Sequence, residues 1–163
     1  MNSYTTNKMN KYLFDSNSVS DFYDKSSDGY TKICEKLSSF GGTDEVYISI
    51  LTLYEFEYGY ANAPDEKKIA VRKKIEDTQK DFEVLPLLSE GSKLFGVLKK
   101  AIKDSRKLNK ESIKKHNVDI MLAATAMVEN CILVSADSIY VEIQSLNPKL
   151  ALENWLEENS KKC

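Results

Sequence analysis

The sequence has few of the residues that cross-link a chain or bind soft metals, with three cysteines and one histidine in 163 residues. The cysteines, Cys34, Cys131 and Cys163, are odd in number and far apart, so neither a disulfide framework nor a zinc site is expected. The N-terminal stretch lacks the basic start and apolar segment of a secretory signal, and no apolar run approaches a membrane span in length. We therefore expect a cytoplasmic protein that has no contact with a membrane.

The pattern of apolar residues predicts strands that alternate with helices. A chain of this length with 42% hydrophobic residues suits one domain with a proper core. Strands are expected at 11–14, 46–50, 82–85 and 131–134, and helices at 29–40, 52–61, 64–80, 89–102 and 118–128. The first strand is expected to end in a loop of turn-forming residues, and the glycines at 41–42 to stop the first helix. This alternation predicts an α/β fold with a mainly parallel central sheet flanked by helices, over residues 9–156, with short extensions at 1–8 and 157–163.

Three aspartates occupy positions at which ligands collect in such folds. Asp15 follows the first strand, Asp137 lies just beyond the last predicted strand, and Asp119 begins a helix that is apolar nearly all round. The carboxyl ends of parallel strands meet at one edge of the sheet, near a change in strand order. We expect these three carboxylates to lie close together.

A fourth acid, Glu55, is separated from its neighbour Glu57 by helical geometry. At about 100° per residue, an apolar arc of Leu51, Tyr54 and Tyr58 contains position 55 but not position 57. This interpretation predicts that Glu55 points inward.

Each acid also has a purely structural interpretation. Asp15 and Asp137 suit turns or helix caps, Asp119 suits a helix N-terminus, and Glu55 suits a partly exposed helix surface. The functional interpretation rests on the convergence of all four. Four carboxylates in one cleft repel each other and require a cation, and hard oxygen ligands without His or Cys select Mg²⁺ or Mn²⁺. Such a site suits phosphodiester hydrolysis by a metal-activated water, without a side-chain nucleophile.

Four segments in order resemble the PIN-domain nucleases, especially the VapC-like toxins of toxin-antitoxin pairs. They are MNKYLFDSNSVSD at 9–21, ISILTLYEFEYGY at 48–60, DIMLAATAMVENCILVSAD at 119–137 and LENW at 152–155. The resemblance implies that Asp15, Glu55, Asp119 and Asp137 are the catalytic metal ligands. It also implies that Ser16, Asn17 and Ser135 orient the ligands or a phosphate.

The resemblance further implies an endoribonuclease that uses Mg²⁺ or Mn²⁺ to cut RNA, an antitoxin protein as partner and a homodimer. Two alternatives stay open. One is a PIN-like protein that binds RNA or a partner without catalysis. The other, a weaker one, is an aspartyl-phosphate phosphatase with Asp15 as nucleophile, although Asn17 stands where its usual second Asp would be.

A net charge of −2 argues at first against a nucleic-acid partner. The basic residues are concentrated, however, because residues 93–116 hold nine of them against two acidic ones. With the four candidate ligands set aside, 21 acidic residues remain against 23 basic ones. Possible contacts to the RNA backbone are Lys107, Lys110, Lys114 and Lys115, and the alternative is a solvated helix face.

His116 lies in this lysine-rich stretch, is expected to be a solvated side chain and receives no role. Phe22, Tyr23, Phe56 and Tyr60 are aromatic residues that fit ordinary core packing better than an open groove for a partner helix.

Overall fold

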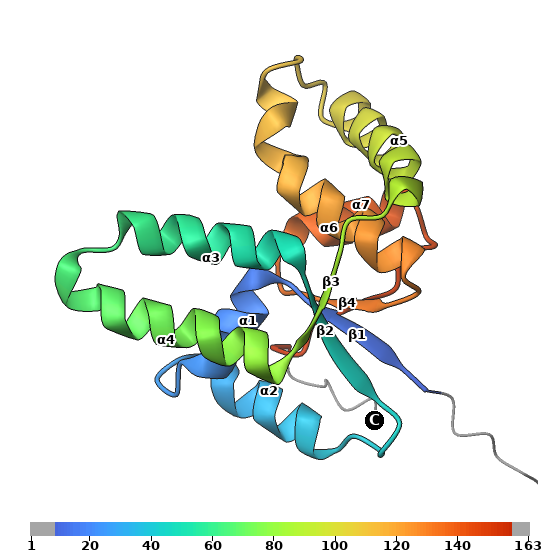
Figure 1. Ribbon diagram of the computed structural model, residues 1–163. Coiled ribbons are helices and arrows are strands. Elements are labelled where there is room, and N and C mark those ends of the chain that lie inside the picture. Colours follow the sequence, from blue (N-terminus) through green and yellow to red (C-terminus); the bar gives the residue numbers. More distant parts are fainter. Residues whose placement is uncertain (1–8, 158–163) are drawn as a thin grey trace, which may run out of the picture.

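A computed structural model describes residues 9–157 of the chain (Figure 1). The strands are β1 (Lys11–Phe14), β2 (Glu45–Ser49), β3 (Glu83–Leu85), β4 (Ile132–Val134) and β5 (Leu152–Glu153). The helices are α1 (Ser16–Tyr23), α2 (Asp28–Ser38), α3 (Ile50–Asn62), α4 (Asp65–Asp81), α5 (Ser89–Ser105), the 3₁₀ helix η1 (Ser112–His116), α6 (Asn117–Val128) and α7 (Ser138–Leu146). The predicted α/β class is confirmed. The predicted extensions, apart from Glu157, lie outside the described residues.

All five strands are parallel and form one sheet in the order β3-β2-β1-β4-β5. Leu13 in the central strand β1 lies opposite Tyr47 of β2 and Leu133 of β4. The chain builds the sheet from β1 to β3 on one side and then returns to add β4 and β5 on the other. The strand order therefore changes between β1 and β4, where α/β sheets commonly bind ligands.

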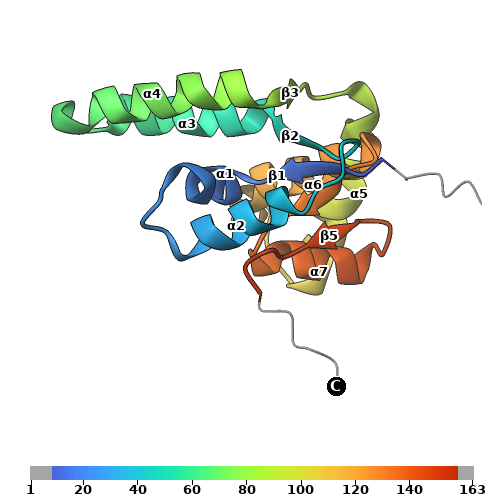
Figure 2. The same ribbon diagram turned by 90° about the horizontal axis from the view of Figure 1, so that it is seen from below.

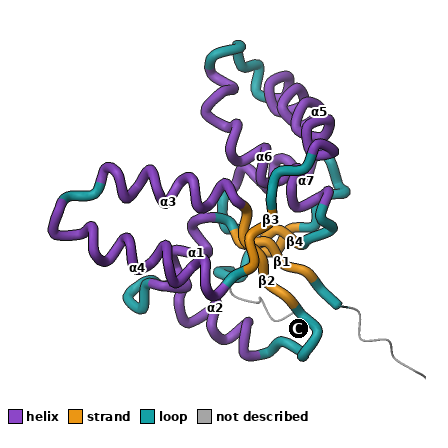
Figure 3. Tube along the Cα trace, viewed as in Figure 1, coloured by secondary structure: helices purple, strands orange, loops and turns teal. Residues whose placement is uncertain are grey.

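Helices cover both faces of the sheet and form two cores (Figures 1 and 3). Successive side chains of a strand point to opposite faces. Leu13 packs with α5, α6 and α7, whereas Tyr12 and Phe14 pack with helices α1 to α4 and Trp155. The central strands β1 and β4 are therefore covered on both faces, which explains the apolar runs KYLF and CILV.

Helices α3 and α4 form a hairpin that extends beyond the sheet (Figures 1 and 2). Arg72 of α4 makes a bidentate ion pair with Glu57 of α3, at 2.8 and 3.0 Å, and lies 4.0 Å from the centre of the Tyr60 ring. Phe56 is buried in the core, and Phe22, Tyr23 and Tyr60 pack against that core, so the packing interpretation of these aromatics is the better one.

Two local predictions were wrong, and one strand was missed. Residues 16–18 are not a loop, because Asp15 accepts a hydrogen bond from the Ser18 amide and thereby starts α1 directly after β1. Helix α2 ends at Ser38, before Gly41, and neither Gly41 nor Gly42 has a positive φ. The two-residue strand β5 was not predicted, because its pairing with β4 comes from tertiary contact and not from its own length.

No helix within residues 9–157 is both long and apolar enough to cross a membrane.

Candidate functional site

A polar cavity of about 80 Å³ lies at the carboxyl ends of β1 and β4. All four predicted acids line it, namely Asp15, Glu55, Asp119 and Asp137. The other five lining residues are Ser16, Asn17, Val118, Leu122 and Tyr140. The fold thus brings together acids that are up to 122 positions apart in the chain, from 15 to 137. The predicted helper Ser135 lies just behind the cavity wall and bonds to Asp15.

Asp15 is the most deeply buried of these acids, with 5% of its surface exposed. One carboxylate oxygen, Oδ1, accepts a 2.7 Å hydrogen bond from the Ser18 amide, and the other, Oδ2, accepts one from the Ser135 hydroxyl. Burial raises the pKa of Asp15, against the lowering effect of the hydrogen bonds from Ser135 and Ser18. An ionised carboxylate in such a place needs a positive charge near it.

Ser135 connects two of the acids across the change in strand order. Its hydroxyl donates to Asp15 and accepts a 3.0 Å hydrogen bond from the Asp137 amide. Asp137 in turn caps α7, since its Oδ1 accepts the Ile139 amide at 3.1 Å. The capping interpretation of Asp15 and Asp137 is therefore also correct, and both caps line the cavity.

Glu55 lines the cavity, but the predicted inward arc of α3 is wrong. Tyr54 and Tyr58 of that arc are 72% and 74% exposed, and Glu55 itself is exposed. The buried side of α3 carries Leu53 and Phe56, because α3 packs against α4 and the sheet on that side. Tyrosine is a poor marker of the inner face, since its hydroxyl tolerates water.

Ser16 holds Glu55 at the edge of the cavity. The Ser16 hydroxyl donates a hydrogen bond to Glu55 Oε2 and also lies 3.3 Å from the Thr52 hydroxyl. The first residue of α1 and the second turn of α3 are thereby connected. Asn17 is exposed at the same rim, and no hydrogen bond of its side chain to another described residue is found.

Tyr140 forms part of the cavity wall and was missed by sequence reasoning. It lies three residues after Asp137 on α7, so helical spacing alone was the available signal. The pKa of Tyr140 is raised well above its ordinary value. The largest cause is burial, and the negative charges of Asp119, Asp15, Asp137 and Glu55 add to it in that order. The phenol thus experiences the field of all four acids.

Asp119 begins the buried helix α6, and His116 precedes it by one helical turn. Burial raises the pKa of Asp119 more than hydrogen bonding with His116 lowers it. The expectation that His116 is solvated was wrong, because its side chain is only 14% exposed and its Nδ1 lies 3.5 Å from Asp119 Oδ2. Spacing of three residues at a helix start was the signal that could have revealed this contact.

The donor set of the cavity suits a hard divalent cation. It consists of four carboxylates with no sulfur ligand, and buried Asp15 lacks an ionic partner among the described residues. Within residues 9–157, however, no three His, Cys, Asp or Glu side chains are gathered closely enough to hold a metal ion. The types of donor atom therefore fit Mg²⁺ or Mn²⁺, while the carboxylates lie too far from one another to coordinate one ion directly in this arrangement.

A basic groove of about 410 Å³ lies between α5 and η1 and is lined by Gly96, Lys99, Lys100, Lys103, Lys110, Ile113 and Lys114. Of the four lysines predicted to contact RNA, the groove contains Lys110 and Lys114 but not Lys107 or Lys115. Lys100 and Lys114 make ion pairs with Asp104 and Glu111, whereas Lys99, Lys103 and Lys110 make none with other described residues. The groove keeps a net positive charge.

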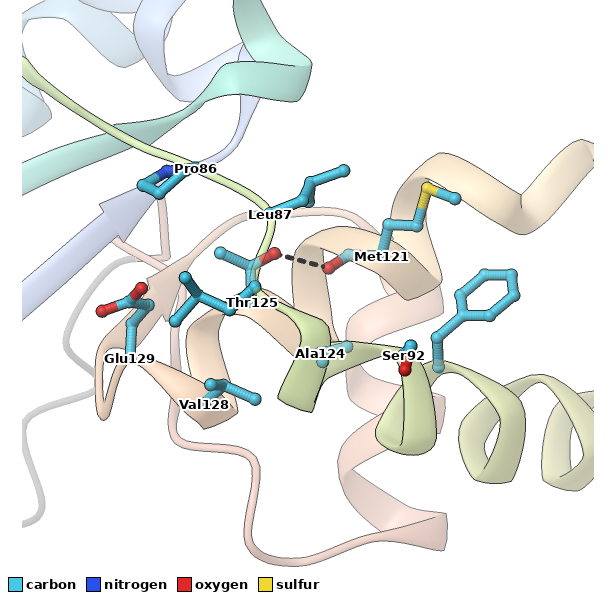
Figure 4. Close-up of a pocket in the computed structure, with 11 residues that line it drawn as sticks. Pro86, Leu87, Ser92, Met121, Ala124, Thr125, Val128 and Glu129 are labelled. Carbon is cyan, nitrogen blue, oxygen red and sulfur yellow. Dashed lines mark hydrogen bonds between the residues drawn. The ribbon is translucent and has the colours of Figure 1, made fainter.

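An apolar pocket of about 170 Å³ lies apart from the acids, between the β3–α5 connection, α5 and α6 (Figure 4). Leu87 and Met121 face it, and the Thr125 hydroxyl donates to the Met121 carbonyl at 2.9 Å. A shallower apolar pocket adjoins it, because Pro86, Leu87 and Met121 line both.

A parallel α/β sheet with an acidic cavity at its change of strand order defines the class of this protein. The model of the PIN domain family matches residues 12–146, and the chain belongs to that family. Comparison with curated protein sequences found no match.

Solved structures share the fold at low sequence identity. VapBC2 from Rickettsia felis, bound to a DNA fragment from its promoter, gives a TM-score of 0.67 at 23% identity and covers 89% of this chain and 98% of that one. VapBC-1 from nontypeable Haemophilus influenzae gives 0.70 at 17%, with 90% and 99% covered. VapBC-5 from Mycobacterium tuberculosis, of the VapBC family of toxin-antitoxin systems, gives 0.58 at 14%, with 88% and 96% covered.

Proposed function

We propose that this protein is a Mg²⁺- or Mn²⁺-dependent endoribonuclease and the toxin of a toxin-antitoxin pair. The observation that carries the proposal is the cavity at the change of strand order, around which a PIN-domain chain gathers Asp15, Glu55, Asp119 and Asp137. Four carboxylates around one small cavity, with Asp15 buried and Asp119 half-buried, favour a divalent cation, because the ion offsets their negative charge.

The four acids would hold the metal, directly or through water. Glu55 and Asp137 are exposed, and each keeps one carboxylate oxygen, Oε1 of Glu55 and Oδ2 of Asp137, that accepts no hydrogen bond from another described residue. When bound, the cation would polarise a water for attack and balance the charge of the phosphate. No side-chain nucleophile is required.

The protein groups around the acids hold them in position. Ser135 and the Ser18 amide orient the two oxygens of Asp15, and Ser16 orients Glu55. Asn17, at the rim, is placed to donate a hydrogen bond to a phosphate oxygen. The side chains of Val118 and Leu122 form an apolar part of the cavity wall.

The basic groove between α5 and η1 provides a path for the RNA backbone. Its lysines attract phosphate without reading bases, which predicts binding that weakens with salt. Helix η1, which carries the groove residue Lys114, ends at His116, and Asp119 of the acidic cavity follows within one turn. Lys107 and Lys115 remain candidates for contacts outside the groove.

An antitoxin protein is the proposed partner, since VapBC-5 is described as a member of the VapBC family of toxin-antitoxin systems and another structure of this fold, from Klebsiella pneumoniae, as a toxin-antitoxin complex. We also propose a homodimer through the two adjoining apolar pockets, where Tyr54, Leu87 and Leu88 are exposed. Exposed apolar patches of this kind are typical of protein interfaces. The proposed location is the cytoplasm, where RNA substrates are available.

Incubation of the purified protein with total RNA, with Mg²⁺ or Mn²⁺ and with or without EDTA, tests the activity. We expect discrete cuts that EDTA abolishes, and mapping of the cut ends would identify the RNA. Binding of RNA without cleavage in either metal would instead support the non-catalytic alternative. Hydrolysis of a small phosphate ester with intact RNA would support the phosphatase alternative.

Metal binding should also stabilise the fold. A cation that binds only the folded state adds about 2.7 kcal/mol to the free energy of unfolding at 100 times its Kd. We therefore expect Mg²⁺ or Mn²⁺ to raise the Tm of the wild type more than that of Asp119→Asn, measured by calorimetry across a metal titration. Equal stabilisation of both proteins would contradict a ligand role for Asp119.

A further inference from the structure

A chain of four side chains connects α7, the end of α5 and the start of α6 behind the acidic cavity. Arg106, just after α5, makes an ion pair with Glu142 of α7, with Nη2 at 2.6 Å and Nε at 2.8 Å from Oε2. Its remaining nitrogen, Nη1, lies 3.0 Å from His116 Nε2. The other ring nitrogen of His116, Nδ1, faces Asp119 Oδ2 at 3.5 Å.

The direction of the hydrogen bonds along this chain follows from the chemistry of arginine. A guanidinium has only N–H donors and stays protonated, so His116 Nε2 must accept the bond from Arg106. An imidazole nitrogen that accepts carries no proton. The proton of the neutral ring must then be on Nδ1, which is the nitrogen that faces Asp119.

We propose that Arg106 fixes His116 in the Nδ1-protonated tautomer and that His116 is thereby a positioning residue for Asp119. That Asp119 is a metal ligand rests on the proposed function, whereas the position of the proton on His116 does not. The contact with His116 orients the Asp119 carboxylate, on which the Tyr140 hydroxyl also acts, for a cation or its water. This is the role that outer hydrogen-bond partners commonly have around metal ligands.

The start of α6 and the side chain of Arg106 hold His116 against Asp119. His116 is the N-cap residue of α6 and Asp119 lies in the first turn, so the helix holds the two side chains on one face. The His116 ring is mostly covered, and Arg106 is held by both the ring and Glu142. At 3.5 Å the His116–Asp119 contact is at the outer limit of hydrogen bonding, and catalytic hydrogen bonds often shorten when a site is loaded.

The position of the proton is directly measurable, because His116 is the only histidine of the chain. The protein is labelled with ¹⁵N, freed of any polyhistidine tag, and its imidazole nitrogens are recorded by NMR at neutral pH. We expect an unprotonated Nε2 and a protonated Nδ1 in the wild type, and a shift toward the other tautomer in Arg106→Met. A wild-type ring with a proton on Nε2, alone or together with Nδ1, would overturn the proposal.

The positioning role is tested by two amides that replace different ring nitrogens. The side-chain amide of Asn reaches the place of Nδ1, whereas that of Gln reaches the place of Nε2. We expect His116→Asn to keep Mn²⁺ affinity within about threefold, and His116→Gln and His116→Leu to lose roughly 10- to 100-fold, by calorimetric titration.

Equal Mn²⁺ affinity in all three variants and the wild type would overturn the positioning role. A folded wild type that shows the expected tautomer, binds no Mn²⁺ and cuts no RNA would instead refute the proposed function, and with it the role toward a metal. Failure of the tautomer in an active, EDTA-sensitive enzyme would refute only this further inference. The two proposals therefore fail in distinguishable ways.

Discussion

Asp15→Asn is expected to lower metal-dependent RNA cleavage by at least about 100-fold, since substitutions even at outer partners of metal ligands cost 10- to 100-fold. The amide keeps the size of the carboxylate and an oxygen for the Ser18 amide, but it removes the buried negative charge at the centre of the four acids. Without that charge the cavity holds a cation less tightly. The rate of cleavage of a defined RNA at saturating Mg²⁺ and Mn²⁺ measures the effect.

A matched pair on α3 serves as the control. Glu55→Gln removes a charge from the cavity, whereas Glu57→Gln removes one that faces Arg72 on the exposed side of the α3–α4 hairpin. Loss of an exposed ion pair costs at most about 1 kcal/mol of stability. We expect Glu55→Gln to be impaired and Glu57→Gln to cleave like the wild type. An Asp15→Asn protein of undiminished activity would refute the proposed site.

Phe14→Ala is expected to lower the free energy of unfolding by about 3–5 kcal/mol, as is usual for buried aromatic residues. Phe14 is fully buried in the middle strand, and its ring centre lies 5.1 Å from that of Trp155 and 5.8 Å from that of Phe82. Removal of the ring leaves a cavity between three segments that are far apart in the chain. Since small domains have only about 5–15 kcal/mol in total, a large part of the stability is lost.

Urea unfolding followed by circular dichroism measures this loss, with Ile69→Ala as the control. Ile69 lies on α4 and is 85% exposed, so its truncation should change stability by less than about 0.5 kcal/mol. Comparable losses in the two variants would mean that Phe14 is not in the core as described. Because Asp15 follows Phe14 directly, a partly unfolded β1 should also reduce activity.

Much of the candidate site was accessible from the sequence. The buried strands before Asp15 and Asp137 and the apolar helix after Asp119 are visible as runs of apolar residues, and their ends place the three acids at one edge of a parallel sheet. Glu55 was found for a wrong reason, because the exposure of Tyr54 and Tyr58 depends on how α3 packs with α4. The contact of Arg106 with His116 and the place of Tyr140 in the cavity were missed because they depend on helix packing, whereas the three-residue spacing of His116 and Asp119 was visible in the sequence.

By itself, the sequence determined most of the strands and helices and the side chains that follow them, because apolar periodicity and helix caps act between near neighbours. Only the tertiary structure decided that Ser135 reaches across from β4 to Asp15, that five lysines share one groove and that Arg106 meets His116. These contacts depend on strand order and helix packing. Those arrangements are set by the burial of both sheet faces together and not by any single segment.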